Sequence, residues 1–151
     1  MTDDIDPKLE ELIEAGYECS QILVAMGLHR QGKTNWDLIR SLEGLKGGLG
    51  YSGRLCGALT GGASLLGLYA GRGPELEEPS SELDPMILEF VEWFEETIGQ
   101  KYGGTDCDQI TATCLDNEEL SLTCVPIVIN TFAKIEDILK NHGFDMTKGR
   151  E

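Results

Sequence analysis

A stretch of 17 uncharged residues, from Leu55 to Gly71, constrains the fold of this chain more than any other feature. Arg54 and Arg72 flank it, so this segment has to be buried in a protein core or in a membrane. A membrane-spanning helix needs roughly 20 apolar residues, and Gly57, Gly61, Gly62 and Gly67 suit close packing of helices in a soluble core. We therefore predict a buried helix here and no membrane insertion.

The rest of the chain also favours helices, because apolar residues recur at helical spacing and no segment alternates as a convincing strand does. The apolar, β-branched run 122–129 leaves a strand open as an alternative at that point. Helix starts are indicated by Asp6–Pro7, Thr34 or Asn35, Asp84–Pro85, Thr105–Asp106 before Cys107, and Thr123 before Cys124. Helix ends are indicated near Gly27, Leu45, Gly103 and Gly143. The first helix contains Gly16, where it could break. We predict an all-α, single-domain bundle of about five to six helices over residues 1–151.

Charge and composition narrow the function further. The chain has 27 acidic and 12 basic residues and a net charge of -15, which excludes nucleic acid as an expected partner. Residues 71–85 are acidic and rich in proline, so we expect an exposed connection there. The N-terminus shows no basic and apolar export signal, and we expect a cytoplasmic protein. A homodimer would be favoured if one apolar helix stripe remained uncovered.

Five cysteines are more than a cytoplasmic chain of 151 residues needs for folding, so metal binding or thiol chemistry is indicated. Cys56, Cys107 and Cys124 are predicted in the first turn of a helix, where free N–H groups and the helix dipole favour a thiolate. Cys19 shares the apolar face of the first helix and is predicted to point inward. No Cys-x-x-Cys occurs, so the fold itself must gather these four cysteines.

The surroundings of these cysteines resemble a family of redox-active proteins named for its C, GCAxxG, C, C cysteine pattern. The matching segments are Gly16-Tyr17-Glu18-Cys19-Ser20-Gln21, Cys56-Gly57-Ala58-Leu59-Thr60-Gly61-Gly62, Cys107, and Cys124 before the last helix. Their order and separations agree along nearly the whole chain. One departure is Leu55, which stands where the family pattern has a glycine before its second cysteine.

The resemblance implies redox activity through Cys19, Cys56, Cys107 and Cys124. Related helical modules in split-Soret cytochromes are associated with iron-sulfur centres, which implies a cluster held by four thiolates and electron transfer with a redox partner protein rather than turnover of a small substrate. The haem of those cytochromes is not implied, because the chain has no Cys-x-x-Cys-His. Cys114 matches none of the family positions, and we expect a spare or substitute ligand.

Two other mechanisms remain open for the same residues. In one, two cysteine pairs cycle between dithiol and disulfide without metal, and the Cys56 thiolate attacks first. In the other, zinc at the four thiolates stabilises a non-enzymatic interaction module. The glycine-rich loop 47–53 leads to Cys56, and Gly53 and Gly57 are the predicted positions for close backbone approach to a cofactor.

A rival motif lies over residues 27–34. The string Gly27-Leu28-His29-Arg30-Gln31-Gly32-Lys33-Thr34 matches the P-loop pattern of nucleotide-binding proteins and follows an apolar run. A working P-loop lies between a strand and a helix of a parallel sheet, and the chain shows no set of buried strands to form one. A P-loop-like nucleotide binder is therefore kept only as an alternative.

Overall fold

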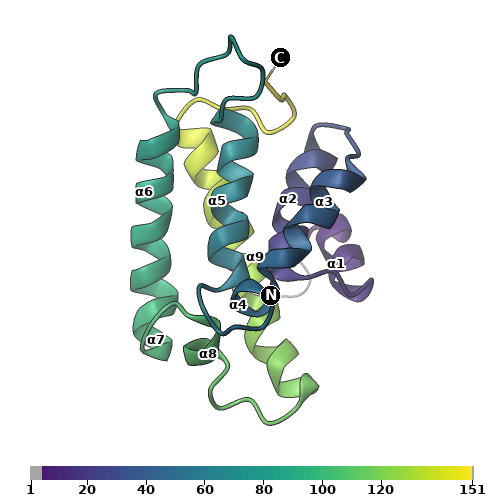
Figure 1. Ribbon diagram of the computed structural model, residues 1–151, viewed down its shortest axis with the longest axis vertical. Coiled ribbons are helices and arrows are strands. Elements are labelled where there is room, and N and C mark those ends of the chain that lie inside the picture. The colour runs from purple at the N-terminus through teal and green to yellow at the C-terminus, as the bar shows by residue number, and fades with distance from the viewer. Residues whose placement is uncertain (1–4, 151) are drawn as a thin grey trace.

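The uncharged stretch forms α5 (Gly57–Ala70), the central helix of the computed structural model, which describes residues 5–150 (Figure 1). Leu65, Leu66 and Tyr69 of α5 are fully buried, and the helix packs against α2 (Cys19–Arg30), α6 (Leu83–Phe94) and α9 (Asn117–Asn141). The predicted all-α fold is confirmed, as is the buried helix. No helix within the described range is both long and apolar enough to cross a membrane.

The remaining elements are also helical. α1 (Pro7–Glu14) and α3 (Trp36–Leu42) lie beside α2, and a 3-10 turn, η2 (Glu43–Leu45), leads to the short α4 (Lys46–Leu49). A π-helical turn, η3 (Glu95–Gly99), and α7 (Gln100–Tyr102) extend α6 until Gly103 ends it with a φ of 80°. The short α8 (Cys107–Ile110) then precedes α9. Across residues 5–150 the only β pairing is an isolated bridge between Leu55 and Asp106.

Glycine lets α2 and α5 approach each other closely. A Cβ atom at Gly61 of α5 would stand 2.6 Å from the Cα atom of Ser20 on α2, well inside ordinary van der Waals contact. The hydroxyl of Ser20 is itself buried and donates a hydrogen bond of 2.8 Å to the carbonyl of Leu42. Gly61 therefore fixes the spacing between the two helices that carry Cys19 and Cys56.

Several predicted helix boundaries differ from the observed ones. The first helical region breaks at Gly16, which has a φ of 86°, so Cys19 begins a new helix instead of lying within one. α6 begins at Leu83, ahead of the predicted Asp84–Pro85 start. The largest error concerns α9, which begins at Asn117 because Asp116 caps it with a 2.9 Å hydrogen bond from the amide of Glu119. Cys124 therefore lies inside α9 rather than in its first turn.

Three long helices start at the same end of the molecule. α2, α5 and α9 run in the same direction, and α4 and α8 lie at the end where α2 and α5 begin (Figure 1). The acidic connection between α5 and α6 lies at the opposite end, and most of its residues are exposed, as predicted. Because the positive ends of the α2 and α5 dipoles share one end of the bundle, that end suits negatively charged groups.

Candidate functional site

The four cysteines predicted as one site come from four different elements. Cys19 is the first residue of α2, Cys56 is the N-cap residue of α5, Cys107 is the first residue of α8, and Cys124 lies in α9. Cys56 is buried and the other three are half-buried. All are free thiols. The helix-start placement predicted for Cys56 and Cys107 is confirmed, and that for Cys124 is wrong.

Cys19 and Cys56 meet where the first turns of α2 and α5 pack together. A Cβ atom at Gly57, the residue after Cys56, would lie 3.6 Å from the Cβ atom of Cys19 and 3.5 Å from the amide nitrogen of Ser20. A larger side chain at Gly57 would therefore point toward Cys19. The two glycines at positions 57 and 61 form one narrow face of α5, which brings these two thiols to the same place.

Cys56 and Cys107 are joined by the bridge between their neighbours. The amide of Cys56 donates a 3.0 Å hydrogen bond to the carbonyl of Thr105, and the amide of Cys107 donates one of 2.6 Å to the carbonyl of Arg54. These bonds flank the antiparallel pair Leu55 and Asp106. The start of α8 is thereby fixed beside the start of α5.

Cys124 and Cys114 complete the cluster on its α9 side. The sulfur of Cys114, in the connection between α8 and α9, lies 3.5 Å from the hydroxyl oxygen of Thr123. Burial raises the pKa of Cys124, and ionisation of Cys56, Cys107 or Cys114, together with the charge of Glu18, raises it further. Cys114 therefore lies at the edge of the cluster, in contact with Thr123, the sequence neighbour of Cys124, and the sequence pattern did not reveal this contact.

Burial sets the acidity of the four thiols. Desolvation raises the pKa of Cys19, Cys56 and Cys107 and, with neighbouring thiolates adding to it, raises the pKa of Cys124 to about 12. At Cys56 the amides of Ala58 and Leu59 lower the pKa, but desolvation is the larger effect. The predicted thiolate-favouring environment is therefore wrong for the free thiols. They carry their protons at neutral pH.

The arrangement has direct consequences for metal binding. No group of three or more His, Cys, Asp or Glu side chains among residues 5–150 is arranged so that it could hold a metal ion. Cysteine thiolates are the donor type that binds iron-sulfur clusters and zinc. Burial is the largest cause of the raised pKa of Cys19 and of Cys124, neighbouring thiolates would add to it, and a bound cation would offset that added repulsion.

The glycine-rich loop before Cys56 has an unusual backbone. Positive φ angles occur at each of the five consecutive residues Gly47, Gly48, Leu49, Gly50 and Tyr51. Amides further along the loop close it through hydrogen bonds to earlier carbonyls, of which the one from Arg54 to Gly48 measures 3.1 Å. Side chains at Leu49 and Tyr51 make this left-handed turn unfavourable, and the glycine pattern of the sequence did not predict positive φ at these two residues.

The two glycines predicted to approach a cofactor each have a packing role. At Gly53 a Cβ atom would overlap the carboxylate of Asp108, and at Gly57 it would face Cys19. Gly53 also needs its φ of 77°, which a residue with a Cβ atom adopts only at a cost. Contact of Gly53 or Gly57 with a cofactor stays a prediction.

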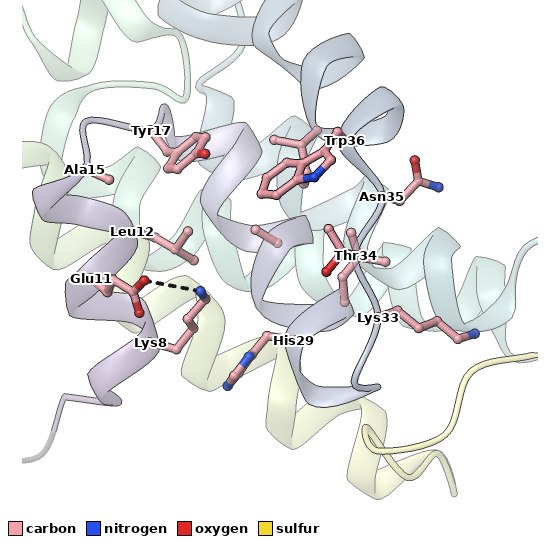
Figure 2. Close-up of a pocket in the computed structure, with 13 residues that line it drawn as sticks. Lys8, Glu11, Leu12, Ala15, Tyr17, His29, Lys33, Thr34, Asn35 and Trp36 are labelled. Atoms are coloured by element: carbon pink, nitrogen blue, oxygen red, sulfur yellow. Dashed lines mark hydrogen bonds and ion pairs between the residues drawn. The ribbon is translucent and has the colours of Figure 1, made fainter.

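The P-loop interpretation of residues 27–34 is wrong. Gly27 through Arg30 belong to α2, and the part of the chain described here has no strand ahead of them. His29, Lys33 and Thr34 instead line a pocket of about 280 Å³, together with Tyr17 and Trp36 on its far side (Figure 2). The side chain of Lys33 points away from these two aromatic rings (Figure 2). A phosphate-binding loop is therefore not formed.

Comparison with known proteins agrees with the cysteine pattern. A family model described as "Putative redox-active protein (C_GCAxxG_C_C)" matches residues 17–138, a range that includes all five cysteines. Neither the curated proteins nor the solved structures give a significant match.

Proposed function

The chain belongs to the C_GCAxxG_C_C family of redox-active proteins, and on this premise we propose that Cys19, Cys56, Cys107 and Cys124 act together as one redox centre. The observation that carries the proposal is the convergence of four elements, distant in sequence, at one end of the bundle. The centre would exchange electrons with a partner protein, and we expect it to work in the reducing cytoplasm.

Our leading form of this proposal is an iron-sulfur centre with the four thiolates as ligands. A cluster would supply one-electron chemistry at this end of the bundle. The chain's own contribution would be to exclude water through the burial of Cys56 and to offset negative charge through the helix starts at Cys19 and Cys56. This form is supported by the mutual repulsion of neighbouring thiolates, which adds to the desolvation that raises the pKa of Cys19 and Cys124 and which a cationic core would relieve.

A disulfide form is the second candidate, because the described side chains present no ready-made metal site. Cys56 and Cys107 are the pair with the closest backbone connection. Their two thiols would lose two protons and two electrons to a disulfide of a partner protein, forming one S–S bond here and leaving a dithiol on the partner. Zinc at the same thiolates would instead give a redox-silent interaction module.

Anaerobic purification and reconstitution with iron and sulfide distinguishes these forms. We expect visible absorption, stoichiometric iron and sulfide, and a reversible one-electron titration. Cys56→Ser should abolish cluster binding, whereas Cys114→Ser, the matched control at the edge of the cluster, should retain it. A colourless, iron-free protein with a reversible two-electron titration would refute the cluster and support the disulfide. Bound zinc with no redox titration would refute the proposed redox function.

A further inference from the structure

Four large apolar side chains are exposed next to the cysteines, and we call them the apolar rim: Leu49, Tyr51, Leu55 and Leu115. Their exposed fractions are 49%, 71%, 44% and 87%. Leu55 directly precedes Cys56, and Leu115 directly follows Cys114. The loop that carries Leu49 and Tyr51 is attached to the start of α8 by a hydrogen bond of 3.3 Å from the amide of Asp108 to the carbonyl of Gly53. The rim therefore belongs to the same end of the bundle as the thiols.

Backbone conformation indicates that this exposure is not incidental. Leu49 and Tyr51 have φ angles of 73° and 66°, which residues with a Cβ atom adopt only at an energetic cost. Neither side chain recovers that cost in the core, because both are exposed. Strain that is not offset by burial in the core is characteristic of sites that present a side chain to a ligand or partner.

The ring of Tyr51 is held in place before any partner arrives. The ring lies against Gly47, where a Cβ atom would overlap it, and the ammonium group of Lys46 lies 5.4 Å from the ring centroid. Lys46 is in turn paired with Glu43 at 3.4 Å. A fixed, exposed tyrosine loses little conformational entropy on binding, and such residues are frequent anchors in protein interfaces.

Charge decides what kind of partner this surface fits. The segments 43–56 and 105–119, which carry the rim, contain six acidic residues and two basic ones. One of the two basic residues, Lys46, is already paired. A second copy of the chain would bring the same excess of negative charge and a net charge of -15 to the contact, which opposes self-association. A protein with basic residues around an apolar contact is attracted instead.

We propose that the apolar rim is the docking surface for a basic redox protein, with Tyr51 as its central contact and the surrounding carboxylates facing the partner's basic residues. The exchange of electrons across this contact rests on the function proposed above, whereas the contact itself does not. Docking here would bring the partner beside Leu55 and Leu115, the sequence neighbours of Cys56 and Cys114, which shortens the path to the thiols.

Mitochondrial cytochrome c, a strongly basic redox protein, is the probe. We would measure its binding to the full chain by calorimetry at low and at physiological salt, and its reduction by the chemically reduced protein. We expect saturable binding that weakens about tenfold or more as salt rises and about tenfold or more in the variant Leu49→Ser/Tyr51→Ser. Leu55→Ser, outside the strained turn, is a second test in case the double variant unfolds.

Leu76→Ser is the matched control, because Leu76 is 96% exposed and lies in the connection at the opposite end of the molecule (Figure 1). Its binding should equal that of the unmodified chain. Three binding results would overturn the proposal: no binding, binding that does not depend on salt, and equal binding by all variants. It would also be overturned if sedimentation showed a dimer that Tyr51→Ser dissociates. Rim-dependent binding without reduction would support the docking surface and count against the proposed redox function.

Discussion

Replacement of Gly61 by alanine tests whether close contact between α2 and α5 holds the site together. The added Cβ atom would stand 2.6 Å from the Cα atom and 3.0 Å from the carbonyl oxygen of Ser20. These are backbone atoms, so no side-chain rotation can relieve the contact, and the two helices have to separate. The same separation would move Cys19 away from Cys56.

The size of the effect follows from two opposing contributions. Overpacking of a tight contact costs about 1–3 kcal/mol, and replacing a helical glycine by alanine returns about 1 kcal/mol of helix propensity. Gly67→Ala in the same helix isolates the second contribution, the gain in helix propensity, because nothing lies within 4 Å of the Cβ position at Gly67. The control should therefore be stabilised by about 1 kcal/mol. The two variants should differ by the overpacking cost, about 1–3 kcal/mol.

Urea unfolding followed by circular dichroism gives the free energy of unfolding of each variant. We expect Gly67→Ala to be more stable than the unmodified chain and Gly61→Ala to be less stable than Gly67→Ala by the stated margin. Equal stability of the two variants would show that Ser20 does not limit the approach of α5, and the geometric explanation of the glycine motif would then be wrong.

Two further predictions concern the opposite end of the bundle. His142 lies 3.0 Å from a carboxylate oxygen of Glu89 and 2.7 Å from one of Glu82, and these carboxylates raise its pKa above 6.5. The pairing of protonated His142 with these carboxylates therefore stabilises the fold fully below pH 6.5, and this stabilisation is lost as the pH rises through the folded-state pKa. The urea midpoint of the unmodified chain should fall over that range, whereas the midpoint of His142→Gln should not. Tyr69→Phe should cost about 1–3 kcal/mol in the same assay, because the buried hydroxyl lies 3.1 Å and 2.7 Å from the carbonyls of Gly27 and Met146.

Local signals predicted the helices well where one signal dominated. Asp6 caps α1 ahead of Pro7, and Gly103 ends α7, as expected. At α9 the prediction started the helix at Thr123 with Pro126 in the first turn, whereas the helix begins after Asp116. Pro126 lies inside the helix, where it has no N–H group to donate to the carbonyl of Leu122, a residue that is 70% exposed.

Other features of the site depend on contacts that no local pattern encodes. Cys19 meets Gly57 only because α2 and α5 run side by side, and the bridge beside Cys107 forms between segments about 50 residues apart. The pKa of Cys56 could not be predicted from the local sequence either. Its place at a helix start predicted a lowered pKa, but the desolvation that raises it comes from the tertiary packing of the whole end.

The raised thiol pKa values also provide a way to separate the two redox mechanisms. Forming a disulfide from protonated thiols releases two protons with two electrons, so its potential should fall by about 59 mV per pH unit, twice the 29.6 mV that a tenfold change represents for a two-electron couple. That slope should persist through neutral pH, because burial keeps the thiols of Cys56 and Cys107 protonated there. Thiolates that bind iron have already lost their protons, so a cluster potential should vary much less. Potentials measured from pH 6 to 8 on purified protein make this comparison, and a steep slope in an iron-loaded sample would contradict it.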